Sequence, residues 1–232
     1  MIEETWTGKL ARRGVVVAPS LLASDFANLE REIRALESGG VEILHVDVMD
    51  GRLVPNISVG VPVVASIRKV TKLKLDVHLM IVEPERYIKA FADAGADSLT
   101  AHVEAVADPL ALASEIRSLG VAPGLALNYG TSVEKIAPYA RDFDILLTMS
   151  VPAGFGGQKF REDALDSVRV LRSLARDDAL IEIDGGIDES TIGAAARAGA
   201  NLLVAGTAVF KASDYGEQTR KLGRIASEAA RD

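Results

Sequence analysis

His45 and Asp47 stand near the end of an apolar stretch, where an imidazole and a carboxylate could act together. The run 43–49 begins with apolar and β-branched residues and leads to a turn at Gly51, which predicts a buried strand. Because alternate residues of a strand point to one side, His45, Asp47 and Met49 face the same way. A buried imidazole and carboxylate need a partner. A divalent metal ion or a simple His–Asp hydrogen bond would supply one, and this stretch alone leaves both open.

Similar residues follow two other apolar runs. His78 follows the run 73–77, and Asp184 follows the run 180–183. If these runs are parallel strands of one barrel, their carboxyl ends meet at a single rim, where active sites of that fold lie. His45, Asp47, His78 and Asp184 would then converge. Two imidazoles and two carboxylates suit Zn²⁺, with Fe²⁺, Mn²⁺ or Co²⁺ as alternatives.

The two aspartates favour proton transfer at a carbon atom. Asp47 and Asp184 come from the second and seventh predicted strands and so approach the rim from opposite sides. One carboxylate on each face of a planar intermediate is what a two-base inversion requires. A metal ion beside them would stabilise the negative oxygen of an enediolate. Asp184 could instead serve only to form the Asp-Gly-Gly turn.

Glycine-rich loops follow the last three predicted strands and suggest a phosphate site. In this fold, backbone N–H groups of the loops after strands 7 and 8 often bind phosphate, and glycine allows the ligand to approach closely. Each loop could equally be an ordinary turn. The residues concerned are Gly154, Phe155, Gly156, Gly157, Gly185, Gly186, Gly206 and Thr207.

Three methionines and the remaining histidine also fall at strand ends. Met49, Met80 and Met149 would form a dry, polarizable lining for the reacting carbon, although methionine at such positions often only fills gaps in the core. His102 closes the fourth predicted strand. It could lie behind the metal ligands or be a rim residue with satisfied hydrogen bonds, and the sequence favours the second interpretation.

Composition excludes several classes of function. The chain has 232 residues, 48% of them hydrophobic, and a net charge of −7, which argues against a general nucleic-acid binder. It contains no cysteine, so any metal must use histidine and carboxylates. A small anion such as phosphate remains compatible with the acidic average. We find neither a secretory signal nor an apolar run of membrane-spanning length, and we expect a cytoplasmic protein without a membrane partner.

The pattern of apolar runs predicts a single (β/α)8 TIM barrel over residues 15–232, preceded by an N-terminal extension over residues 1–14 that packs on the outside. The strands are continuous apolar runs, as expected for parallel strands buried on both faces. A doubly wound sheet is the alternative, but no Gly-rich fingerprint follows the first strand. The predicted strands are 15–18, 42–48, 73–77, 98–103, 122–127, 144–149, 180–183 and 202–205. The predicted helices are 28–38, 61–70, 85–94, 109–119, 133–139, 163–175, 190–198 and 214–230.

Six motifs together resemble the ribulose-phosphate 3-epimerase family over about residues 15–212. They are Ala18-Pro19-Ser20-Leu21-Leu22, the stretch from His45 to Gly51, Val54-Pro55-Asn56, the stretch from Asp76 to Met80, Gly154-Phe155-Gly156-Gly157-Gln158 and Asp184-Gly185-Gly186. The resemblance implies a metal-dependent enzyme of the pentose phosphate pathway that interconverts D-ribulose 5-phosphate and D-xylulose 5-phosphate. It also implies a homo-oligomer, a dimer or a hexamer.

The same resemblance assigns roles to residues. His45, Asp47, His78 and Asp184 would bind the metal, and Asp47 and Asp184 would be the acid/base pair. Ser20 would contact the substrate, beside His78 and the three methionines. The glycine-rich loops and Thr207 would bind its phosphate.

Departures from the family pattern leave the exact sugar open. Arg52 stands where the family usually has His, Pro152-Ala153 precedes the Gly-Phe-Gly-Gly loop, and Asn128-Tyr129 replaces the usual Asn-Pro. Thr207 replaces a common Ser and keeps the hydroxyl. Allulose 6-phosphate or a tetrulose phosphate would use the same chemistry. A lyase of the hexulose-phosphate synthase type would need a Lys at a strand end, where this chain has none, and a non-catalytic phosphate-binding barrel would need no paired carboxylates.

Overall fold

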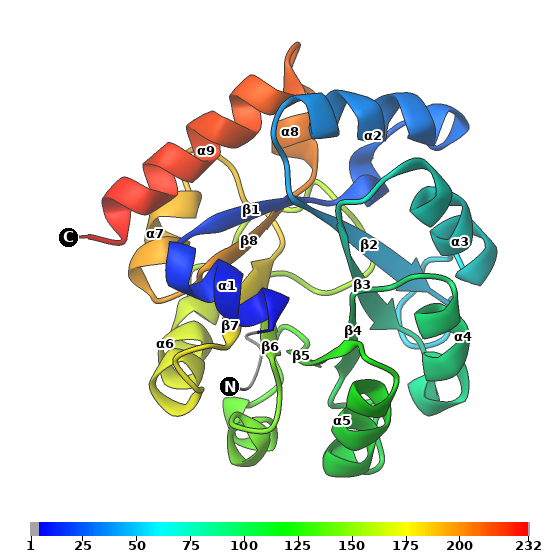
Figure 1. The fold of residues 1–232 in the computed structure, drawn as a ribbon. Coiled ribbons are helices and arrows are strands. Elements are labelled where there is room, and N and C mark those ends of the chain that lie inside the picture. Colours follow the sequence, from blue (N-terminus) through cyan, green and yellow to red (C-terminus); the bar gives the residue numbers. More distant parts are fainter. Residues whose placement is uncertain (1–4, 232) are drawn as a thin grey trace.

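The computed structural model describes residues 5–231, and within this range eight parallel strands form one sheet that closes into a barrel. The strand order is β1-β8-β7-β6-β5-β4-β3-β2. Strands β1 and β2, at the two ends of this order, meet through a parallel bridge between Ser20 and His45. Figure 1 looks along the barrel and shows the helices arranged around the strands. The predicted TIM barrel is therefore confirmed.

The strands lie where the apolar runs predict them. The clearest difference is that β3 runs on to Met80, so that His78 lies within the strand. The strands are β1 Val16–Pro19, β2 Ile43–Met49, β3 Lys74–Met80, β4 Ser98–His102, β5 Ala122–Leu127, β6 Ile145–Met149, β7 Leu180–Asp184 and β8 Leu202–Ala205.

The helices agree less closely with the sequence predictions. The segment predicted as a helix over 133–139 forms two 3₁₀ turns, because Pro138 lacks the N–H that a continuous α-helix needs. The short helix α8 was not expected. The α-helices are α1 Trp6–Arg13, α2 Leu29–Ser38, α3 Val61–Val70, α4 Ile88–Asp93, α5 Pro109–Ser118, α6 Ala164–Leu174, α7 Ile192–Arg197, α8 Thr207–Phe210 and α9 Tyr215–Ala229. The 3₁₀ helices are η1 Leu21–Ala23, η2 Phe26–Asn28, η3 Pro84–Tyr87, η4 Val133–Lys135 and η5 Ala137–Tyr139.

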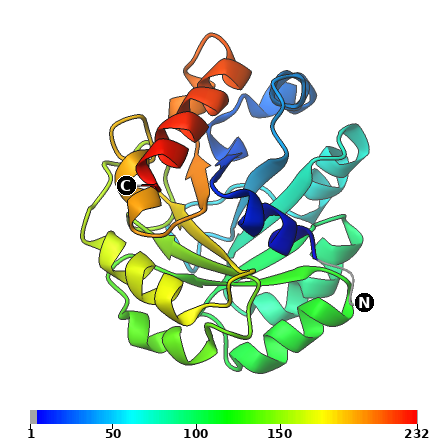
Figure 2. The same cartoon turned by 60° about the vertical axis from the view of Figure 1, so that its left-hand side comes forward.

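Helix α1 packs against the end of the barrel where the strands begin. Its N-cap Thr5 accepts a hydrogen bond from the backbone N–H of Gly8 at 3.1 Å. Leu10 is buried in a cluster with Ile43 and Leu180, which lie at the starts of β2 and β7. Figures 1 and 2 both show α1, in dark blue, lying against the strands. The described part of the extension therefore does more than pack on the outside, since α1 contributes Leu10 to the hydrophobic core.

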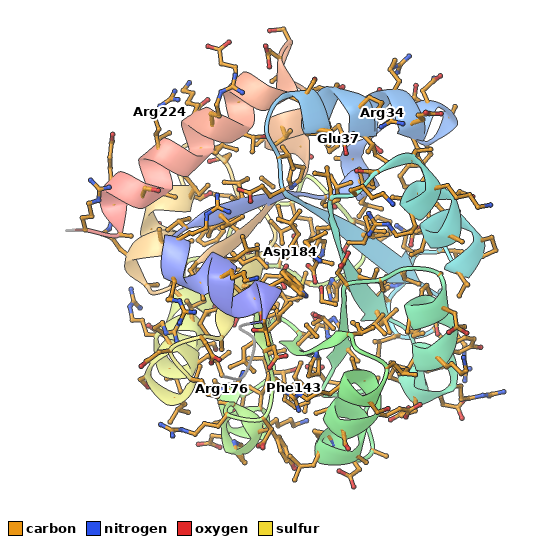
Figure 3. All side chains as sticks on the ribbon, in the orientation of Figure 1. Arg34, Glu37, Phe143, Arg176, Asp184 and Arg224 are labelled. Carbon is orange, nitrogen blue, oxygen red and sulfur yellow. The ribbon has the colours of Figure 1, made fainter. Side chains whose placement is uncertain are left out.

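The interior of the barrel is layered along its axis. The cluster that contains Leu10 and Ile43 fills the end next to α1, and a second apolar cluster, with Met49, Met80 and Met149, lies at the carboxyl ends of the strands. Buried polar side chains lie between the two clusters. Because alternate residues of a strand point to the same side, Ile43, His45, Asp47 and Met49 of β2 all face the interior, each in a successive position along the barrel axis. Figure 3 labels Asp184 inside the ring of strands.

Candidate active site

A cavity of about 900 Å³ opens at the carboxyl ends of the strands. Its size is typical of a site for a small molecule. His45 and His78 lie below its surface and are fully buried. The other predicted site residues line it directly: Ser20, Asp47, Met49, Met80, Met149, Gly154, Phe155, Gly156, Gly157, Asp184, Gly185, Gly186, Gly206 and Thr207.

Four of these side chains meet at the floor of the cavity. His45, Asp47, His78 and Asp184 each offer one ligand atom, and these atoms all lie within 4.8 Å of one another. Oδ1 of Asp47 is 3.2 Å from Nε2 of His45 and 3.1 Å from Nδ1 of His78. The pairing of β2 with β3 creates this arrangement, since Asp47 and His78 are direct partners in the register.

The hydrogen bonds around this group fit a divalent cation. Nδ1 of His45 lies 2.6 Å from Oδ2 of Asp76. A carboxylate only accepts hydrogen bonds, so this nitrogen carries a proton, and the lone pair of the neutral ring lies on Nε2, facing Asp47. A neutral ring would therefore point its lone pair at an oxygen of Asp47, and a positive charge belongs between the two atoms. Either a metal cation or a second proton on His45 supplies it, because burial lowers the pKa of His45 but Asp47 and the carboxyl groups around the ring raise it well above its usual value. An outer carboxylate that orients an inner histidine ligand is a common feature of metal sites.

Burial and charge push the pKa values of the two aspartates apart. Burial alone would raise the pKa of Asp47, but the charge of a protonated His45 and its hydrogen bond to Asp47 outweigh burial, and the pKa falls well below its usual value. Burial and the negative charge of Asp47 raise the pKa of Asp184 to about 7. Two carboxyl groups in one cavity, one with a lowered pKa and one with a raised pKa, are typical of acid/base catalysis.

The sequence of the chain matches that of a known protein family. The model of the "Ribulose-phosphate 3 epimerase family" matches residues 16–210. The chain belongs to the ribulose-phosphate 3-epimerase family. Membership in this family makes the protein an epimerase that acts on a ketose phosphate.

Curated ribulose-phosphate 3-epimerases resemble the chain over most of its length. The protein of Bacillus subtilis (strain 168) is 48% identical over 204 residues, covering 86% of this chain and 94% of its own length. The protein of Synechocystis sp. is 46% identical over 210 residues, covering 88% of this chain and 91% of its own. The protein of Mycobacterium tuberculosis (strain H37Rv) is 44% identical over 222 residues, covering 94% and 95%.

Solved structures of other enzymes share the fold of this ribulose-phosphate 3-epimerase family member. A 3-keto-L-gulonate-6-phosphate decarboxylase from Vibrio cholerae superimposes with a TM-score of 0.70 at 16% identity, covering 93% of this chain and 98% of its own. A 3-hexulose-6-phosphate synthase from Salmonella typhimurium gives 0.66 at 19% identity, covering 93% and 99%. At these identities the likeness concerns the fold alone. Among residues 5–231, no helix is both long and apolar enough to cross a membrane.

Two acidic residues behind the site were missed by the sequence analysis. Asp76 accepts a 2.7 Å hydrogen bond from Ser98 in addition to its contact with His45. Oε1 of Glu182 lies 3.1 Å from Nδ1 of the same histidine. Burial and the negative charge of Asp76 raise the pKa of Glu182 well above its usual value. Both acids stand two residues before a predicted ligand, so the alternation of the strands is the signal that could have revealed them.

The sequence pattern favoured His102 as a rim residue, but in the structure it lies buried next to His78. It is 1% exposed, and its Nε2 lies 2.8 Å from Nε2 of His78. Burial lowers the pKa of both His78 and His102, despite the neighbouring carboxylates Asp47 and Glu104.

The Asp-Gly-Gly turn after β7 requires its glycines for structural reasons. Gly186 has a φ of +59°, and a Cβ there would lie 2.4 Å from the backbone nitrogen of Phe160. Gly185 has a φ of +111° and is similarly crowded by the side chain of Val151. The turn that carries Asp184 is therefore held in one conformation, whatever the loop binds.

A hydrogen bond joins the loop after β2 to the loop after β6. Asn56 Nδ2 donates this 2.7 Å hydrogen bond to the carbonyl of Gly154. Of the residues that depart from the family pattern, Ala153 is buried in the methionine cluster, whereas Arg52 and Pro152 are exposed. None of these three residues lines the cavity directly, and the four residues at its floor follow the family pattern.

Proposed function

We propose that the protein inverts the configuration at C3 of a ketose phosphate and interconverts D-ribulose 5-phosphate and D-xylulose 5-phosphate. The observation that carries this proposal is that Asp47 and Asp184 reach one cavity from β2 and β7, on different sides of the barrel. Family membership supports the class of substrate.

In the proposed mechanism, one aspartate removes the C3 proton and the other returns a proton to the opposite face. The electron pair of the C3–H bond moves to C2 and its oxygen, which gives an enediolate. The first aspartate becomes a carboxylic acid and the second becomes a carboxylate, and the reverse reaction exchanges their roles. Ser20 donates a 2.6 Å hydrogen bond to Oδ2 of Asp47 and would hold this carboxylate in position.

A divalent cation is the proposed cofactor, and His45, Asp47, His78 and Asp184 would hold it. Zn²⁺ is the first choice for this set of nitrogen and oxygen donors, with Fe²⁺, Mn²⁺ or Co²⁺ as alternatives. When bound, the cation supplies positive charge that stabilises the negative oxygen of the enediolate.

The rest of the cavity would hold the substrate. Met49, Met80 and Met149 form an apolar surface beside the aspartates, which would exclude water from the reacting carbon. We propose that the phosphate binds at the loops after β6, β7 and β8, which are neighbours in the sheet. The residues concerned are Gly154, Phe155, Gly156, Gly157, Gly185, Gly186, Gly206 and Thr207.

Further features of the proposal concern the cell and the assembly. We propose a role in the pentose phosphate pathway, a cytoplasmic location and a homo-oligomer, either a dimer or a hexamer. A rice relative named as a cytoplasmic isoform is 44% identical over 205 residues, which supports the location. We also propose that residues 15–232 are the catalytic unit and that residues 1–14 are an extension of it.

Turnover on a panel of ketose phosphates tests this proposal. The panel contains D-ribulose 5-phosphate, allulose 6-phosphate and a tetrulose phosphate, because the departures from the family pattern at Arg52, Pro152 and Ala153 leave the exact sugar open. We expect the highest kcat/KM with D-ribulose 5-phosphate and loss of turnover after treatment with a chelator. A preference for another sugar would replace the proposed substrate, and full activity without divalent cations would refute the proposed cofactor.

A further inference from the structure

A chain of hydrogen-bonded side chains leads from His78 toward the surface. Nε2 of His78 lies 2.8 Å from Nε2 of His102, and Nδ1 of His102 lies 3.3 Å from Oε2 of Glu104. The two imidazoles are buried, whereas the side chain of Glu104 is 21% exposed. Nothing in the proposed mechanism uses His102 or Glu104.

The carboxylate at the outer end gives this chain a direction. Oε1 of Glu104 already accepts a 2.9 Å hydrogen bond from the backbone N–H of Asn128. Since a carboxylate only accepts, the contact with Glu104 favours a proton on Nδ1 of His102. A neutral imidazole with its proton on Nδ1 has its lone pair on Nε2, so Nε2–H of His78 is the donor to His102. The lone pair of His78 would then lie on Nδ1, 3.1 Å from Oδ1 of Asp47. Asp47 is also only an acceptor, so two neutral rings can donate to just one of the two carboxylates, and Oδ1 of Asp47 already faces Nε2 of His45 at 3.2 Å.

The rings are also oriented for this bond. The planes of His78 and His102 differ by 21° and their centroids are 5.0 Å apart, although their nearest nitrogens are much closer. The two imidazoles therefore meet edge to edge, with the hydrogen bond close to both ring planes. Backbone hydrogen bonds from Val103 to Ala126 and from Ala105 to His102 fix the outer part of the chain.

We propose that His102 and Glu104 are positioning residues that hold His78 as its Nε2–H tautomer, with the Nδ1 lone pair directed at the cation site. This inference rests on the proposed function, since it assigns a purpose to residues behind the proposed cation. It also identifies the competing state. If the chain ran in the opposite direction, the proton of His78 would lie on Nδ1, 3.1 Å from Oδ1 of Asp47. That hydrogen bond would satisfy Asp47 without a cation and would close the site.

Glu104→Gln is the sharpest variant, because a glutamine amide can donate to His102 and so permits the opposite direction. The matched control is Glu115→Gln, which removes the same charge from an exposed position on α5. A second pair tests the middle of the chain: His102→Leu removes the acceptor for His78, whereas His102→Gln keeps an acceptor oxygen.

Two measurements read the result without an activity assay. The first is the tautomer of His78 in the cation-free protein, from the ¹⁵N shifts of its ring nitrogens. The second is the dissociation constant of Zn²⁺ alone. We expect Nε2–H in the wild type and in Glu115→Gln, and a larger Nδ1–H population in Glu104→Gln. Zn²⁺ binding should weaken by about 10- to 100-fold in Glu104→Gln and His102→Leu, with recovery in His102→Gln.

The two proposals fail in different ways. If the wild type does not bind Zn²⁺ or another divalent cation, the proposed cofactor is wrong, and the tautomer measurement still tests the direction of the chain. If the wild type binds Zn²⁺ but already holds His78 as Nδ1–H, the inference is overturned and the proposed function stands. The same conclusion follows if Glu104→Gln keeps both the tautomer and the affinity of the wild type.

Discussion

Ser20 at the end of β1 donates a 2.6 Å hydrogen bond to Oδ2 of Asp47 on β2, across the place where the barrel closes. The bond occupies one oxygen of Asp47, while the other oxygen faces His45 and His78. It thus connects the closure of the fold to the orientation of a proposed acid/base residue.

Removing this hydrogen bond should slow turnover. In Ser20→Ala, we expect kcat/KM for D-ribulose 5-phosphate to fall by about 10- to 100-fold, because a hydrogen bond to a charged group contributes about 1.5–3 kcal/mol. The control is Ser24→Ala, whose hydroxyl donates to the backbone carbonyl of Leu21. Equal steady-state kinetics for the two variants would show that the contact with Asp47 has no part in catalysis.

The turn after β7 should not tolerate a side chain at Gly186. In Gly186→Ala the new Cβ would collide with the backbone of Phe160, at a positive φ that alanine rarely adopts. We expect a loss of about 1–3 kcal/mol in the free energy of unfolding, measured in urea, and a fall in kcat. Gly223→Ala is the control, because Gly223 lies in α9 and a Cβ there would meet no atom within 4 Å. That variant should unfold at a higher urea concentration than the wild type. Equal stability of the two variants would contradict the crowding at Gly186.

Glu104 should make the stability of the protein depend on pH in the acid range. Burial raises its pKa, but hydrogen bonds from His102, Thr131 and the backbone of Asn128 outweigh burial and bring the pKa to about 2. A carboxyl with a lowered pKa stabilises the fold above its unfolded-state value and loses that effect as pH falls toward the folded-state value. We therefore expect wild type to exceed Glu104→Gln in stability at pH 7 by on the order of 2–3 kcal/mol.

This stability difference should shrink progressively between about pH 5 and pH 2. Urea unfolding of both proteins across this range measures it. A difference that stays constant with pH would show that the effect of the substitution is not due to the charge of Glu104.

The fold and the residues at the floor of the cavity could be predicted from the sequence, because the strand pattern locates both the strands and the side chains that point into the barrel. Strand patterns place Asp47 and Asp184 toward carboxyl ends, with His45 on the same face as Asp47, and a parallel barrel has only one rim toward which they can point. Asp76 and Glu182 were not recognised, because a charged residue inside an apolar strand gains its role from a partner on another strand. His102 was assigned to the rim for the same reason, since its contact with His78 depends on the packing of β3 against β4.

The N-terminal helix should contribute to stability rather than to chemistry. The side chain of Leu10 packs from α1 against the starts of the strands, at the opposite end of the barrel from the cavity. In Leu10→Ala, we expect a loss of about 2–5 kcal/mol in the free energy of unfolding and unchanged kcat in the folded protein. Lys9→Ala, at an exposed position of the same helix, is the control. If Leu10→Ala is as stable as Lys9→Ala, α1 is not part of the core in solution.

The central claim is that Asp47 and Asp184 exchange protons with C3 of a ketose phosphate from opposite faces. Turnover of D-ribulose 5-phosphate in D₂O by wild type, Asp47→Asn and Asp184→Asn, with deuterium at C3 followed by NMR, tests it most directly. We predict deuterium at C3 of the product formed by wild type, and a loss of about 10²- to 10⁴-fold in kcat for each variant. Near-native turnover in either variant, or a product that keeps its original C3 hydrogen, would contradict the account.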